Sequence, residues 1–141
     1  MKVLFLDIDG VLRIDFESHI DLIDQSLILN LQHVIKETGI KIVLSSDWRR
    51  KATWLKLATD QLGFFGIKIF DTTPIHFSCK LRWQEIQEWL DEHEDIEKFA
   101  VLDDDTGAMI PDQAETFFFT DYDLGGLNLN MVEQLIQYFN N

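Results

Sequence analysis

The chain begins with an apolar run that ends abruptly in two carboxylates. Residues 3–6 are all apolar, and the run is long enough for a strand buried on both faces. Asp7 and Asp9 follow at once, and Gly10 then lets the chain turn sharply. Because burying an unpaired charge is very costly, two such carboxylates do not belong inside a strand. We therefore place them at the carboxyl end of the strand, where parallel α/β sheets bind their ligands.

The rest of the chain alternates between strand-like and helix-like segments. Short apolar runs typical of strands recur at residues 40–44, 67–70, 99–102 and 116–120. Apolar residues at helical spacing lie between or after these runs, at residues 27–35, 55–62, 83–90 and 132–139. This alternation predicts an α/β fold of three layers, Rossmann-like, with a mostly parallel central sheet of about five strands.

Capping and turn residues indicate where these segments end. Gly39 is placed to end the first helix, and Asp47 is a candidate N-cap for the second. Asn128 or Asn130 can cap the last helix, and residues 71–74 predict a turn after the third strand. We see no linker and no repeat, so residues 1–141 are expected to form a single domain.

The chain is strongly acidic. Its net charge is −13, from 12 Lys and Arg against 25 Asp and Glu. This balance argues against a broad nucleic-acid-binding face, because cationic side chains must replace the counterions of the phosphates. It also disfavours binding to an anionic membrane. Part of the acidity can instead serve a hard cation, whose preferred ligands are carboxylate oxygens.

Cysteine usage and hydropathy point to a cellular compartment. Cys79 is the only cysteine, which excludes an internal disulfide and a cysteine metal cage. A lone cysteine suits a reducing cytoplasm. The first apolar run is too short for a signal peptide, and no run approaches the length of a transmembrane helix. We therefore expect a cytoplasmic protein without membrane contact.

Three pairs of polar residues follow directly after predicted strands. They are Asp7 and Asp9, Ser45 and Ser46, and Asp103 and Asp104. Because the carboxyl ends of parallel strands lie at one edge of a sheet, we expect the three pairs to converge. Four carboxylates with few basic neighbours repel one another, and a divalent cation relieves that repulsion. A ligand set made only of oxygens favours Mg²⁺.

Neighbouring residues fit a phosphoryl group beside such a cation. The Ser46 hydroxyl can hydrogen-bond a phosphoryl oxygen, and Arg82 or Lys80, near the start of the third helix, can neutralise another. Metal, hydroxyl and basic side chain together stabilise a phosphoryl group in transfer. One carboxylate can then act as the nucleophile while a second one transfers the proton.

The order of these motifs resembles the haloacid dehalogenase (HAD) superfamily of aspartate-nucleophile phosphatases. The matching stretches are residues 7–12 (DIDGVL), residues 42–46 (IVLSS), a basic residue before an amphipathic helix, and residues 101–104 (VLDD). Residues 44–49, 82–90 and 102–105 are also similar to the small capless HAD domains related to those in bacterial RNA-repair proteins. The resemblance implies a Mg²⁺-dependent phosphohydrolase.

The resemblance also implies a role for each matching residue. Asp7 would attack phosphorus and form an aspartyl-phosphate, and Asp9 would protonate the leaving group and then activate water. Ser46 would hold the phosphoryl oxygens. Asp104 would ligate Mg²⁺ together with Asp7 and the Asp9 main-chain carbonyl, with Asp103 beside it.

Two of these assignments have alternatives. Ser45 is one residue from Ser46, and a slip of one residue turns a side chain to the opposite face of a sheet. Arg82 fits the spacing of the family pattern, whereas Lys80 is the residue type more common in the superfamily. Ser46 and Arg82 are the preferred assignments.

Cap domains of this superfamily are insertions that cover the site and select substrates. The first connection here, residues 11–23, is short, and the second holds little beyond one helix and one strand. We therefore expect no cap and an open cleft, which suits a phosphorylated substrate that can be macromolecular. The charge disfavours nucleic acid except as phosphorylated ends, which Arg49, Arg50, Lys51 and Lys56 could contact as a local basic rim.

Two other classes of function could use the same carboxylates. A two-metal nuclease needs an acidic cluster, but it has no need for Ser46 or the basic residue, and the net charge opposes it. A catalytically weak phosphate- or metal-binding module would keep the ligands without turnover. The sequence indicates neither a particular substrate nor an oligomeric state.

Overall fold

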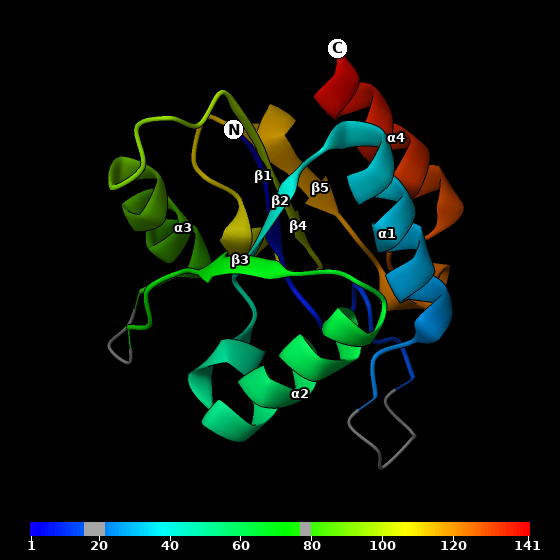
Figure 1. Ribbon diagram of the computed structural model, residues 1–141. Coiled ribbons are helices and arrows are strands. Elements are labelled where there is room, and N and C mark those ends of the chain that lie inside the picture. The colour runs from blue at the N-terminus through cyan, green and yellow to red at the C-terminus, as the bar shows by residue number, and fades with distance from the viewer. Residues whose placement is uncertain (16–21, 77–79) are drawn as a thin grey trace.

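The structure is a computed structural model that describes residues 1–15, 22–76 and 80–141 (Figure 1). Cys79 lies outside the described residues. Five strands form one parallel sheet in the order β3-β2-β1-β4-β5. They are β1 (Lys2–Leu6), β2 (Lys41–Leu44), β3 (Ile69–Thr72), β4 (Lys98–Asp103) and β5 (Phe117–Phe119).

Helices cover both faces of this sheet. Successive side chains of a strand point to opposite faces, so each strand contributes to the core on either side. Leu4 and Leu6 of β1 join one core with the helices α1 (Gln25–Thr38), α2 (Ala52–Phe64) and α4 (Leu129–Asn140). Val3 and Phe5 join a second core with α3 (Arg82–Asp91). Figure 1 shows α3 on the opposite side of the sheet from α1 and α4. The predicted three-layer α/β fold is confirmed, and the described residues contain no inserted cap.

The predicted strands differ from the observed ones most at β3. A strand was expected at residues 67–70 and a turn at 71–74, but β3 runs from Ile69 to Thr72. The third strand is confirmed but lies two residues further along, and the turn prediction is wrong because tertiary partners hold Asp71 and Thr72 in the sheet. The two residues pair with β2, and the Asp71 carboxylate accepts a 2.8 Å hydrogen bond from Nε1 of Trp89.

Two predicted caps are confirmed and one is wrong. Gly39 ends α1 with φ 72°, and the Asn128 side chain caps α4 by accepting from the Met131 N–H. Asp47, however, does not cap α2. Ser46 caps a short 3₁₀ helix, η1 (Asp47–Arg50), and α2 begins only at Ala52. No helix in the described part of the chain is long and apolar enough to cross a membrane.

The register of the three central strands fixes what lies at their carboxyl ends. Leu6 of β1 is level with Leu44 of β2 and Leu102 of β4. The ladder continues for one more residue, because the Asp7 N–H donates to the Leu102 carbonyl and the Ser45 N–H to the Leu6 carbonyl. Asp7, Ser45 and Asp103 therefore follow in one row, on the face that carries α3.

Candidate functional site

A compact group of carboxylates lies at the carboxyl ends of β1 and β4. Asp7, Asp103 and Asp104 each offer an oxygen, and these oxygens all lie within 4.8 Å of one another. Asp7 is 5% exposed and Asp103 is fully buried, whereas Asp104 is the least buried of the three. The predicted convergence of the first and last carboxylate motifs is thus present in the fold.

Gly10 makes room for this group. Its backbone has φ 82°, and a Cβ atom built there would lie 2.2 Å from Oδ2 of Asp104. Only glycine combines the left-handed conformation with the space that the Asp104 carboxylate occupies. The glycine that follows the two aspartates is therefore required by the site as well as by the turn.

Arg82 connects the carboxylates to α3. It is the first residue of that helix, and its Nη1 lies 2.9 Å from Oδ2 of Asp103 and 3.4 Å from Oδ1 of Asp7. Its Nη2 lies 3.1 Å from Oδ1 of Asp47. Lys80 points elsewhere, with its Nζ 3.7 Å from Glu88. Of the two predicted cations, the structure brings Arg82 to the carboxylates.

The single guanidinium does not balance the charge of the group. Burial and the neighbouring charge of Asp103 raise the pKa of Asp7 well above its ordinary value, although Arg82 lowers it. Burial likewise raises the pKa of Asp103, against the lowering effect of Arg82. Burial lowers the pKa of Arg82, but Asp7 and Asp103 outweigh it and raise that pKa overall. The cluster therefore favours protons or another cation.

The Asp9 carboxylate is not one of the three in this group and has partners of its own. Its Oδ1 accepts a 3.0 Å hydrogen bond from Nη1 of Arg13, and its Oδ2 accepts one of 3.2 Å from Nε1 of Trp48. Neither donor was predicted. Arg13 could have been suspected from its spacing of four residues from Asp9, but nothing local joins Asp9 to Trp48.

The two candidate serines are both buried but differ in their contacts. The Ser46 hydroxyl accepts a 3.2 Å hydrogen bond from the Trp48 N–H, as the cap of η1. The Ser45 hydroxyl is buried without a hydrogen-bond partner among the described residues. Ser45, rather than Ser46, lies in the row that contains Asp7.

The predicted basic rim loses one of its members. Arg49 is 4% exposed, and its guanidinium lies 2.7 Å from the buried carboxylate of Glu85. Arg50 also contacts Glu85 and is bonded to Asp47. The prediction that Arg49 belongs to the basic rim is wrong, because its hydrogen-bond partners hold it inside the fold. Lys51 and Lys56 remain exposed.

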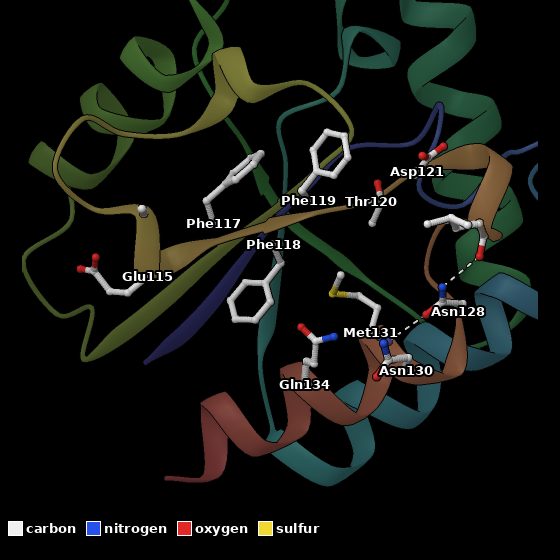
Figure 2. A pocket seen from close by; sticks show the side chains of 13 residues that line it. Glu115, Phe117, Phe118, Phe119, Thr120, Asp121, Asn128, Asn130, Met131 and Gln134 are labelled. Carbon is white, nitrogen blue, oxygen red and sulfur yellow. Dashed lines mark hydrogen bonds between the residues drawn. The ribbon is translucent and has the colours of Figure 1, made fainter.

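Two hollows differ in the kind of residues that line them. One of about 210 Å³ is lined by charged residues beside the cluster, including Asp47, Arg50, Lys80, Arg82 and Asp105. A larger one of about 540 Å³ lies at the far edge of the sheet. Figure 2 shows it between β5 and the start of α4, lined by phenylalanines and by Met131 and Gln134. The chemistry of the carboxylates points to the smaller hollow.

The donor set fits a hard divalent cation. Asp7, Asp103 and Asp104 supply oxygens only, at mutual distances that one ion can span. Burial raises the pKa of Asp7 and of Asp103, and a cation bound beside them would stabilise their charged forms. The Asp9 carboxylate, by contrast, is directed to Arg13 and Trp48.

Comparisons with known proteins identify the family to which the chain is similar. A family model described as the HAD domain in Swiss Army Knife RNA repair proteins matches residues 3–130, which is most of the chain. No match was found among curated proteins or among solved structures.

Proposed function

Because the chain belongs to the family of HAD domains found in Swiss Army Knife RNA repair proteins, we propose that it is a Mg²⁺-dependent phosphohydrolase. The observation that carries the proposal is the position of Asp7. Its carboxylate lies at the carboxyl end of the central strand, within reach of Asp103, Asp104 and Arg82. The three roles that the reaction requires, a nucleophile, a set of metal ligands and a cation for the phosphoryl oxygens, would thus be filled by neighbouring residues.

Asp7 would begin the reaction. One of its oxygens attacks phosphorus while the bond from phosphorus to the leaving oxygen breaks, which gives an aspartyl-phosphate. The leaving oxygen takes a proton from Asp9. The Asp9 carboxylate then removes a proton from water, whose oxygen attacks phosphorus, so that phosphate leaves and Asp7 is restored.

The other residues would bind and orient the phosphoryl group. Arg82 would donate to its oxygens, helped by the position at the start of α3. Ser45 is the better placed of the two serines, because its hydroxyl has no described partner and lies in the row of Asp7. Asp7, Asp103 and Asp104 would hold Mg²⁺, which offsets the negative charge of the carboxylates and the phosphoryl oxygens.

The test is hydrolysis of p-nitrophenyl phosphate with Mg²⁺ and with EDTA. Wild type should turn over only with Mg²⁺, and Asp7→Asn should be inactive because an amide cannot form the acyl-phosphate. Full activity in Asp7→Asn would overturn the proposed nucleophile. A protein that binds Mg²⁺ in calorimetry but never turns over would instead be the catalytically weak binding module.

A phosphorylated nucleic-acid end is the more specific substrate that the family description favours, since it names RNA repair proteins. The described residues contain no cap over the carboxylates, and Lys51 and Lys56 are exposed on the segment that follows Ser46. Charge reversal at both lysines should lower activity on 5′- or 3′-phosphorylated oligonucleotides but spare p-nitrophenyl phosphate. Equal effects on both substrates would contradict a nucleic-acid contact at these lysines.

A further inference from the structure

The Asp9 carboxylate is held on both of its oxygens. Arg13 donates to Oδ1 at 3.0 Å and Trp48 donates to Oδ2 at 3.2 Å. The Asp9 side chain is 47% exposed, whereas that of Arg13 is only 13% exposed and Trp48 as a whole is 5% exposed. A carboxylate that could otherwise rotate in water is thus fixed by two donors from the protein interior.

Both donors are themselves fixed by the backbone around them. The Trp48 ring packs in the core beside α2, and its backbone N–H is bonded to the Ser46 hydroxyl that caps η1. Arg13 closes the turn after β1, because its carbonyl accepts from the Gly10 N–H at 2.9 Å. The backbone segments that carry the two donors are thus held in place around Asp9.

The two bonds leave Asp9 able to react. A carboxylate has about four acceptor sites, so two N–H donors leave room for a leaving group or a water molecule. They also restrict the directions from which a proton can be transferred. Such orientation matters, because a misplacement of about 1 Å can lower a rate by about 10²-fold.

We propose that Trp48 and Arg13 are positioning residues that aim the Asp9 carboxyl group at the leaving oxygen. The proposal rests on the proposed function, since it needs Asp9 as the proton donor. It gives Trp48 of η1 and Arg13 of the turn after β1 a part in the reaction in addition to their part in packing.

The leaving group separates positioning from packing. A simple alkyl phosphate needs a proton on its leaving oxygen, whereas p-nitrophenolate leaves without one. The rate of alcohol or phenol release is measured in a single turnover, before the aspartyl-phosphate is hydrolysed. Trp48→Phe should slow cleavage of the alkyl phosphate by about 10-fold or more, within the 10²–10⁴-fold that a positioned general acid contributes. Cleavage of the aryl phosphate should change less than about 3-fold.

Trp89→Phe is the matched control. Trp89 is also buried, and its Nε1 also donates to a carboxylate, that of Asp71 at 2.8 Å. This variant should affect the alkyl and aryl phosphates equally. Arg13→Met provides a second variant should Trp48→Phe fail to fold, and Arg13→Lys should recover part of the loss because it keeps one donor.

The Asp9→Asn background decides whether the donors act through Asp9. If they do, adding Trp48→Phe to Asp9→Asn should cause no further selective loss on the alkyl phosphate. Equal losses on both substrates, or an additional loss in the double variant, would overturn the positioning role while leaving the phosphatase assignment intact. A wild type without Asp7-dependent hydrolysis would overturn the proposed function and this proposal with it.

Discussion

Two sites of buried charge lie side by side at the carboxyl edge of the sheet, and they differ in how well their charges are matched. Arg49 and Glu85 form one site, with side chains 0% and 1% exposed and an N–O distance of 2.7 Å. Every guanidinium nitrogen of Arg49 donates a hydrogen bond, to Glu85 or to backbone carbonyls. Asp7, Asp103 and Asp104 form the other, with Arg82 as the cation beside Asp7 and Asp103.

The difference distinguishes an ion pair that stabilises the fold from a group of charges that can bind an ion or a substrate. The Arg49–Glu85 pair is closed, because every guanidinium nitrogen of Arg49 has an acceptor within the protein, although burial still lowers the pKa of Arg49 in spite of Glu85. The aspartate cluster is open, because three carboxylates gather beside one guanidinium, and burial raises the pKa of Asp7 and of Asp103 in spite of it. An imbalance of this kind is typical of sites that take up an ion or a substrate.

The largest effect is expected at the open site. Asp7→Asn should reduce turnover to background, because no acyl-phosphate can form. The same change should raise the melting temperature of the metal-free protein, since it removes a charge that burial disfavours. Thermal unfolding in EDTA measures this, with Asp60→Asn on the exposed face of α2 as a control. A loss of stability in Asp7→Asn would contradict the inference that the charges of the aspartate cluster are poorly matched.

The closed site should respond in the opposite way. Glu85→Gln leaves the buried Arg49 charge without its partner, and this should lower the free energy of unfolding by about 3–5 kcal/mol. Asp60→Asn, which removes the exposed Lys56–Asp60 pair, should cost no more than about 0.5–1 kcal/mol. Denaturant unfolding of the two variants compares them directly. Similar small losses would show that the Arg49–Glu85 pair contributes no more than a surface pair does.

The pH dependence should sharpen the comparison. Because the pKa of Asp7 and Asp103 is raised in the folded state, that state binds more protons than the unfolded chain above the ordinary aspartate pKa of about 3.9. These two groups therefore make the metal-free protein less stable as the pH rises from about 4 through their raised pKa values. Mg²⁺ competes with those protons, so its stabilising effect should grow with pH.

Melting temperatures with and without Mg²⁺ at several pH values test this expectation. The increase caused by Mg²⁺ should be larger at pH 7 than at pH 5, and it should be lost in Asp104→Ala. A Mg²⁺ effect that is independent of pH would mean that the ion does not displace protons from this cluster.

The sequence predicts the open site better than the closed one, for a physical reason. The Asp7 and Asp103 motifs follow buried parallel strands, which appear as apolar runs, and the sheet then brings strand ends together. Arg49 and Glu85 are 36 residues apart, and an arginine in a charged stretch gives no local signal that it is buried. The contact of Asp9 with Trp48 spans 39 residues and is hidden for the same reason.

The strand limits follow a similar rule. β1 and β4 agree with prediction to within one residue at each end, because both lie inside the sheet and are apolar except at their ends. β3 is an edge strand with polar residues, and Asp71 stays in it because Trp89 of α3 supplies a hydrogen-bond donor. That donor lies on another element, so turn propensity alone gave the wrong limit.

The smallest expected effects distinguish the two serines that link the open site to the closed one. Arg49 donates to the backbone carbonyls of both Ser45 and Ser46, but their hydroxyls differ. Ser46→Ala removes the cap of η1 and should lower the free energy of unfolding by about 1 kcal/mol. Ser45→Ala removes a buried hydroxyl that has no described partner, so its stability should be unchanged or slightly higher.

Activity should show the reverse order. Ser45→Ala should raise KM for p-nitrophenyl phosphate and lower kcat/KM by about 10-fold, as expected for the loss of one hydrogen bond of about 1.4 kcal/mol to a charged phosphoryl oxygen. Ser46→Ala should change kcat/KM by less than about 3-fold, because Ser46 does not lie in the row that contains Asp7. Denaturant unfolding and steady-state kinetics on the same two variants give both readouts. A larger kinetic loss in Ser46→Ala would return the phosphoryl-binding role to Ser46, the residue that the sequence favours. It would also mean that the position of Ser45 in the same row as Asp7 does not decide which hydroxyl binds the phosphoryl group.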